Sequence, residues 1–211
     1  NPTFNISCSD TNEFVLTVES PLGTDYEYSI DGGTNYQDEP EFSNLSQGTY
    51  NLIVRNKSVG CLTPFGSNPI IIEDPEITVP NKLTFEGCDT SDINVQNAIF
   101  PFNDIGSGDV QSVFASSPNY NASDDFNINS ITYIDTITSL SCPLVVERTF
   151  TITDNCNNTA NAVQIITVVD TTDPSINLPA DITIECTEDE SSANTGVATG
   201  ADTCGTVTIT E

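Results

Sequence analysis

The chain has no histidine, methionine or tryptophan, and only four of its 211 residues are lysine or arginine. Histidine is the commonest general base, the usual partner of a nucleophilic serine or cysteine, and a frequent zinc ligand. Its absence leaves only paired carboxylates for acid–base catalysis, and no motif points to such a pair. We therefore predict that the chain is not an enzyme and has no catalytic residues.

Positive charge is scarce beside 31 Asp and Glu residues, which give a formal net charge of −27. A chain this acidic repels nucleic acids and anionic lipid surfaces, so neither is an expected partner. No apolar run approaches the roughly 20 residues that cross a bilayer, so membrane insertion is not expected. The sequence carries no signal peptide and no initiator methionine, which favours a segment of a larger mature protein.

Apolar and polar residues alternate along much of the chain, and helical periodicity is nearly absent. The alternating segments are residues 14–18, 49–54, 131–137, 145–153 and 163–169. Gly, Asn, Asp and Pro separate the segments, and D-G-G at residues 31–33 predicts a tight turn. Many short strands without helices between them predict an all-β chain made of β-sandwiches.

One stretch of the sequence occurs twice. Residues 74–88 read D-P-E-I-T-V-P-N-K-L-T-F-E-G-C, and residues 173–186 read D-P-S-I-N-L-P-A-D-I-T-I-E-C. The offset of 99 residues between Asp74 and Asp173 is about one small β domain, which predicts tandem modules. The predicted modules are residues 1–73, 74–172 and a truncated 173–211, joined by short linkers in an extended array.

Carboxylates gather where these modules would meet, Glu73 and Asp74 at the first junction and Asp170 and Asp173 at the second. Ca²⁺ binds six to eight oxygen ligands, which such carboxylates can supply, so we predict structural calcium at the junctions. The alternative is that they are solvated turn carboxylates that accept local backbone hydrogen bonds. The oxygen-rich run T-D-N-C-N-N at residues 153–158 is predicted to form a turn of that kind.

Seven cysteines and no C-x-x-C motif favour disulfides in an oxidising, extracellular setting over a zinc or redox site. Reduced, buried thiols are the alternative. The predicted bridges join cysteines of the same module: Cys8–Cys61, Cys142–Cys156 and Cys186–Cys204. The repeat aligns Cys88 with Cys186, and Phe126 stands where Cys204 stands, which predicts that Cys88 is a free, buried thiol. A rival pairing joins Cys88 to Cys156 or Cys142.

Four tyrosines lie close together in the first predicted module: Tyr26, Tyr28, Tyr36 and Tyr50. They permit a sugar-binding platform, but aromatic residues in strands and hairpins more often pack against their neighbours. We therefore favour packing.

Two runs of residues resemble a known class of repeats. The run S-I-D-G-G-T-N-Y-Q, then F-S-N-L-S-Q-G-T-Y-N-L-I-V-R-N and G-C, within residues 29–61, resembles the SprB-type repeat of Bacteroidetes surface proteins. The run R-T-F-T-I-T-D-N-C-N-N-T-A at 148–160, followed by Q-I-I-T-V-V-D-T-T-D-P and I-E-C, is similar to the HYR-like adhesin repeats found beside it. The resemblance covers nearly the whole chain and implies immunoglobulin-like modules.

The resemblance also implies a function. It implies a non-catalytic stalk or filament segment of a large adhesin, secreted by the type IX system, attached to the outer membrane at the cell surface, and linked to gliding motility. The implied partners are neighbouring repeats, the secretion machinery, and an external surface or polysaccharide bound through other parts of the protein. The motifs D-T-I and D-T-T resemble the O-glycosylation pattern of these bacteria, which would place sugars on Thr136 and Thr171.

Two other functions stay open. One is a carbohydrate-binding or accessory β-sandwich module of an exported enzyme, which a glycan array would distinguish from a stalk. The other is a structural subunit that polymerises by strand exchange at an open sheet edge.

Overall fold

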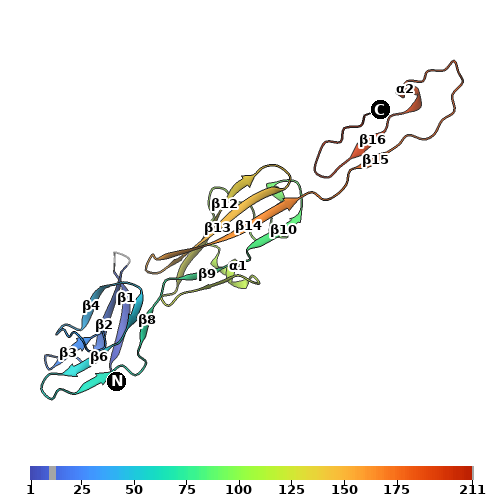
Figure 1. The fold of residues 1–211 in the computed structure, drawn as a ribbon. Coiled ribbons are helices and arrows are strands. Elements are labelled where there is room, and N and C mark those ends of the chain that lie inside the picture. The colour runs from blue at the N-terminus through green and yellow to red at the C-terminus, as the bar shows by residue number, and fades with distance from the viewer. Residues whose placement is uncertain (10–12, 211) are drawn as a thin grey trace. The chain divides into compact units, whose positions relative to one another are not determined.

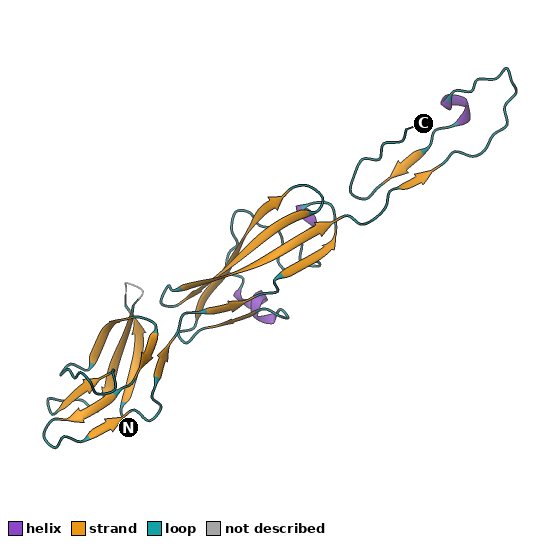
Figure 2. Cartoon of the chain, viewed as in Figure 1, coloured by secondary structure: helices purple, strands orange, loops and turns teal. Residues whose placement is uncertain are grey.

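The computed structural model of the protein describes residues 1–9 and 13–210. Strands make up 43% of these residues and helices 6%, so the predicted all-β class is confirmed as a mostly-β chain with several small antiparallel sheets (Figure 2). Within these residues, no helix has both the length and the apolar character needed to span a membrane.

Most strands are short, and the three longest follow one another late in the chain (Figure 1). The strands are β1 Thr3–Cys8, β2 Phe14–Ser20, β3 Tyr26–Ser29, β4 Glu41–Leu45, β5 Gly48–Tyr50, β6 Ile53–Asn56, β7 Leu62–Pro64, β8 Ile70–Ile72, β9 Glu76–Thr78, β10 Lys82–Glu86, β11 Asn121–Ser123, β12 Ile128–Ser139, β13 Leu144–Asp154, β14 Thr159–Val169, β15 Ser175–Asn177 and β16 Thr199–Ala201. The helical elements are η1 Thr90–Asp92, α1 Gln111–Ser116 and α2 Ser192–Thr195.

The strands form one four-stranded sheet and several smaller ones. The larger sheet has the order β10-β14-β13-β12, and β10 runs parallel to β14. The smaller sheets are β1-β2-β4, β3-β6-β7, β5-β8, β11-β9 and β15-β16. Strand β1 therefore lies at the edge of its sheet.

The chain divides into two compact units. Unit 1 comprises Asn1–Pro80, Gly106–Ile134 and Thr149–Val163, and unit 2 comprises Asn81–Ile105, Asp135–Arg148 and the chain from Gln164 onward. The predicted modules divide the chain differently, and their boundaries at residues 73/74 and 172/173 stay a prediction.

Side-chain alternation builds a core in each unit. All eleven residues of β13 alternate between buried and partly exposed, and Phe14, Leu16 and Val18 of β2 are buried in the same way. In unit 1, Leu16 packs with the buried Tyr28, and in unit 2 Val146 packs with buried residues of β14. The strands predicted at 14–18, 131–137, 145–153 and 163–169 are confirmed.

The strand predicted at residues 49–54 is confirmed only at its two ends, because β5 ends at Tyr50, β6 begins at Ile53, and the two strands belong to different sheets. Strand β5 pairs with β8, whereas β6 pairs with β3 and β7. Leu52 lies between β5 and β6 and is fully buried. Its N–H donates to Asn68 Oδ1 (3.0 Å), and its carbonyl accepts from Asn68 Nδ2 (2.8 Å). The Leu52 carbonyl also accepts from the N–H of Phe65 (2.9 Å), so the backbone stays hydrogen-bonded where the strand pairing changes.

The two copies of the repeated segment have the same local structure. Strands β9 and β15 begin at matching positions of the repeat, and each pairs antiparallel with a later strand, β11 or β16. The registers also match, because Glu76 lies opposite Ser123, the last residue of β11, and Ser175 lies opposite Ala201, the last residue of β16.

The residues that follow β11 and β16 also correspond. Asp124 accepts a hydrogen bond from the N–H of Phe126 (2.6 Å), and Asp202 accepts one from the N–H of Cys204 (2.9 Å). The same carboxylate turn therefore follows each strand. The alignment of Phe126 with Cys204 is confirmed.

The predicted D-G-G turn is confirmed, and Asp31 holds it together. Its carboxylate accepts from the backbone N–H and side-chain amide of Asn35 and from the Ser29 hydroxyl. These bonds, led by the Asn35 N–H, hold the pKa of Asp31 well below its ordinary 3.8. Gly32 and Gly33 have φ angles of 76° and 90°, in the left-handed region.

Replacing Gly33 with alanine is expected to destabilise the protein by about 1–2 kcal/mol, since its φ of 90° disfavours side chains. The new Cβ would also lie 2.8 Å from the Tyr36 hydroxyl oxygen. The measurement is urea unfolding. Gly108→Ala is the matched control, because a Cβ there meets no heavy atom within 4 Å. Equal midpoints for the two variants would contradict the prediction.

Candidate functional site

Glu73 and Asp74 line a pocket of about 110 Å³ between β8 and β11, here called the acidic pocket. Its other lining residues are Glu76, Ser123, Asp124 and Asp125. The β9–β11 pairing assembles it, because it places Glu76 opposite Ser123, directly before Asp124. Asp124 and Asp125 were not predicted as site residues, and the sequence signal available for them was that S-D-D-F at residues 123–126 aligns with A-D-T-C at residues 201–204.

Asp124 is the carboxylate of the acidic pocket whose negative charge is least stabilised by its surroundings. Its Oδ2 accepts from the Phe126 N–H, whereas its Oδ1 is buried and has no hydrogen-bond partner among the described residues. Burial raises the pKa of Asp124 above its ordinary 3.8, and the negative charges of Asp154 and Asp125 raise it further.

The structure does not assemble the four predicted calcium ligands. Asp170 lines a different pocket, which is part of unit 2, and Asp173 is exposed. Within residues 1–9 and 13–210, no group of three or more His, Cys, Asp or Glu side chains is placed to hold a metal ion. Calcium at Glu73, Asp74, Asp170 and Asp173 stays a prediction, and melting temperatures in Ca²⁺ and in EGTA would test it.

Asp124→Asn is expected to raise the melting temperature at pH 7. The folded state binds the Asp124 proton more tightly than the unfolded chain does, so stability falls as the pH rises from 3.8 through the raised pKa. The amide still offers an oxygen to the Phe126 N–H. The advantage of the variant should shrink as the pH falls towards 3.8.

Asp125→Asn is the control for this measurement, because Asp125 lines the same pocket but is exposed. A melting temperature that rises as much in Asp125→Asn as in Asp124→Asn would show that overall charge, and not burial, is responsible.

Glu86 organises the segment of the second predicted junction. Its carboxylate accepts from the hydroxyl and N–H of Thr171 (2.6 and 2.8 Å) and from the hydroxyl and N–H of Thr172 (3.0 and 3.2 Å). These bonds, led by the Thr171 hydroxyl, lower the pKa of Glu86 to about 2. A predicted glycosylation site, Thr171, therefore has its hydroxyl hydrogen-bonded to a carboxylate.

Glu86→Gln is expected to lower the melting temperature at pH 7 but not at pH 2. The depressed pKa gives the wild type stability that is fully present above the ordinary 4.5 and is lost as the pH falls towards about 2. Melting curves between pH 2 and pH 7 measure this loss. A gap between wild type and variant that is the same at both ends of the range would contradict it.

Thr136, the other predicted glycosylation site, is exposed on β12. The preceding Asp135, part of the same D-T-I motif, is 3% exposed. Thr136 and Ile137 of this motif are therefore exposed in the folded chain, whereas the aspartate is buried.

Asp135 forms a buried ion pair with Arg148, which no sequence pattern predicted. Arg148 Nε and Nη2 donate to the two carboxylate oxygens of Asp135 (2.7 and 2.8 Å). The guanidinium also donates to the carbonyls of Phe100 (2.8 Å) and Pro101 (3.0 Å). Asp135 further accepts from the N–H of Asn103 (2.9 Å). The available signal was that Arg148 occupies an inward-facing position in the alternation of residues 145–153.

All three predicted disulfides are wrong: Cys8 is bonded to Cys156, and Cys88 to Cys204. The rival pairings of Cys88 with Cys156 or Cys142 are wrong as well, and Cys88 is not a free thiol. Among the described residues, the unpaired cysteines are Cys61, Cys142 and Cys186, all exposed.

The physical reason is that the folded sheets bring together cysteines that are far apart in sequence, with separations of 148 and 116 residues. Cys156 is 1% exposed and packs with Phe14, Ile72 and Phe126, which places it beside the end of β1. Phe126 does replace a cysteine of the repeat. However, Cys204 bonds to Cys88 of the preceding copy and not to Cys186, so the substitution does not leave Cys88 unpaired.

Asp154 confirms the turn predicted at residues 153–158. It is fully buried, and its carboxylate accepts from the N–H of Cys156 (2.7 Å) and from the N–H and side-chain amide of Asn158 (2.8 and 2.9 Å). These oxygens are occupied by internal hydrogen bonds, which favours the turn interpretation over a ligand site.

The tyrosines pack as predicted. Tyr28 is 1% exposed within the core of unit 1, and Tyr26 and Tyr50 pack against that core. The ring of Tyr36 lies 3.9 Å from the Arg55 guanidinium, a cation–π contact.

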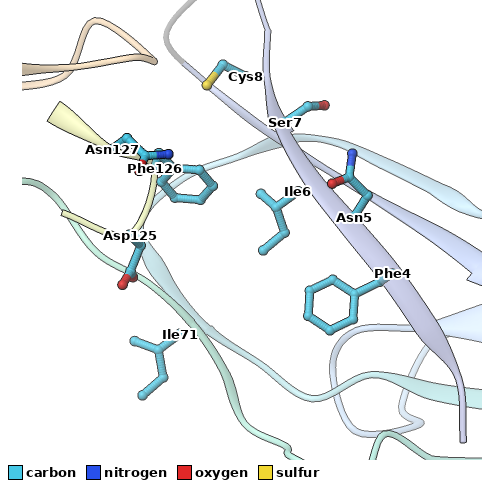
Figure 3. A pocket seen from close by; sticks show the side chains of 9 residues that line it. All are labelled: Phe4, Asn5, Ile6, Ser7, Cys8, Ile71, Asp125, Phe126 and Asn127. Carbon is cyan, nitrogen blue, oxygen red and sulfur yellow. The ribbon is translucent and has the colours of Figure 1, made fainter. Parts of the chain in front are cut away.

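An open groove of about 580 Å³ follows the free edge of β1, here called the edge groove. Figure 3 shows Phe4 and Ile6 of β1 on one side, with Ile71, Asp125 and Phe126 opposite them. An unpaired strand edge beside apolar side chains is able to accept an extended peptide.

Comparisons with protein-family models, with curated proteins and with solved structures found no match to this chain.

Proposed function

We propose that the chain is a non-catalytic stalk or filament segment of a large cell-surface adhesin, built from tandem immunoglobulin-like β-sandwich modules. The observation that supports this most directly is the matching local structure of the two repeat copies. Strands β9 and β15 begin at equivalent residues and pair in the same register, and the same carboxylate turn follows each partner strand. Repetition of one folded motif is typical of array proteins that span distance.

The two disulfides indicate an oxidising environment outside the cytoplasm. Four parts of the proposal rest on the resemblance to SprB-type and HYR-like repeats. They are attachment to the outer membrane, type IX secretion, a role in gliding motility, and O-glycans on Thr136 and Thr171. An intact mass of the protein from its native host above that of the bare chain would support the glycans.

The side chains best suited to sugar binding already donate hydrogen bonds within the protein. A small cavity of about 160 Å³ beside Tyr36 is lined by Asn35 and Gln37. The Asn35 amide donates to Asp31, and the Gln37 amide donates to the carbonyls of Glu39 and Glu41. These internal hydrogen bonds favour a stalk over a carbohydrate-binding module.

A glycan array probed with the folded chain tests the proposal. A stalk segment should bind no glycan above background. Specific binding that is lost in Tyr36→Ala would instead favour the carbohydrate-binding module of an exported enzyme. Binding that is lost in Phe126→Ala would also contradict a pure stalk and would place the sugar site in the edge groove.

A further inference from the structure

The unpaired Cys142 lies in the same pocket as a disulfide. A cavity of about 100 Å³ in unit 2 is lined by Cys142 together with Cys88 and Cys204, which are bonded to each other. Cys142 is exposed and lies between β12 and β13. Three cysteines that lie far apart in the sequence therefore line one small cavity.

We propose that Cys142 is the nucleophile of an internal thiol–disulfide exchange with the Cys88–Cys204 bridge. The Cys142 thiolate attacks Cys88 Sγ, so that a Cys142–Cys88 bond forms and the Cys88–Cys204 bond breaks. Cys204 leaves as a thiolate and takes up the proton that Cys142 gave to solvent. One disulfide is consumed and one is formed, so the step needs no oxidant or reductant.

Exposure selects Cys88 as the sulfur that is attacked. Cys88 is an exposed residue, whereas Cys204 is partly buried. Exchange requires an attacking thiolate and access to the disulfide. Cys142 and both cysteines of the bridge line the same cavity, which is the space through which the exchange would take place.

The exchange changes which parts of the chain are covalently joined. Before it, a bridge ties the segment after residue 172 to Cys88. After it, the bridge lies between residues 88 and 142, and that segment is held only by the backbone and its packing. The released Cys204 then lies in the same predicted module as the unpaired Cys186.

The other unpaired cysteines provide internal controls. Cys61 belongs to unit 1, and neither Cys61 nor Cys186 lines this cavity. Exchange at the cavity should therefore depend on Cys142 and not on the presence of a free thiol elsewhere in the chain.

The test incubates the full chain at pH 8 without air or added thiol. Samples are alkylated at intervals, and their peptides are mapped without reduction. In the wild type, we expect the Cys204 peptide to gain the alkyl label that the Cys142 peptide loses, while a Cys88–Cys142 linked peptide appears. Cys142→Ser should abolish both changes, and Cys61→Ser should leave them unchanged. Circular dichroism confirms that each variant is folded.

Three results would overturn the proposal. One is a Cys204 peptide that stays unlabelled in the folded wild type. Another is labelling of Cys204 that proceeds equally in Cys142→Ser. The third is a new link from Cys186 in place of the link from Cys142.

Discussion

Arg148→Met is expected to destabilise the protein by about 3–5 kcal/mol, the usual cost of removing one partner from a buried ion pair. Arg148 is 0% exposed and Asp135 3% exposed, so the variant would leave a carboxylate without its counter-charge inside the core. The carbonyls of Phe100 and Pro101 would lose the hydrogen bonds from Arg148 at the same time. Equilibrium unfolding in urea measures the change.

Two further variants separate charge burial from other effects. Arg148→Met combined with Asp135→Leu removes both charges and is expected to recover much of the loss, because apolar replacements of a buried pair are often tolerated. Lys57→Met breaks the exposed contact with Asp38 and should cost less than about 1 kcal/mol. An Arg148→Met variant as stable as Lys57→Met would refute the structural role of the pair.

Replacing Cys8 and Cys156 together with alanine is expected to cost about 4–5 kcal/mol of folding stability. The bridge lowers the conformational entropy of the unfolded chain, and this stabilising effect grows with the length of the loop that the bridge closes. The bridge closes a separation of 148 residues. Non-reducing chemical unfolding of the wild type and the double variant measures the difference.

Cys61→Ser is the control that distinguishes the observed bridge from the predicted Cys8–Cys61 bridge. Cys61 is exposed and unpaired in the described chain, so its replacement should change stability by less than about 0.5 kcal/mol. A loss of stability in Cys61→Ser as large as that in the double variant would restore the original pairing.

Local patterns in the sequence predicted local structure well. The alternation in residues 145–153 predicted β13, D-G-G predicted the turn around Asp31, and T-D-N-C-N-N predicted the turn around Asp154. Each of these features depends on neighbours within a few residues. The repeat also aligned Phe126 with Cys204, and these two residues occupy equivalent positions in turns that follow two separate strand pairs.

Features that depend on distant contacts could not be predicted in this way. The alternation shows that Arg148 faces inward but not that Asp135 and two carbonyls meet it there. The register of β9 and β11 brings Asp124 beside Glu73, and no sequence spacing encodes that register. The disulfide predictions failed for the same reason, because they assumed that partners lie in one module.

The overlapping spans of the two bridges limit how far the chain can be stretched. Between Cys8 and Cys204 the backbone runs through 196 residues, but the shortest covalent route crosses from Cys8 to Cys156 and then follows 48 residues. At about 3.5 Å per residue, the contour length between these points falls from roughly 690 Å to roughly 170 Å. Once a tensile load has unfolded every sheet, the bridges would therefore stop the stretch between Cys8 and Cys204 from extending beyond about a quarter of the length it would reach without them.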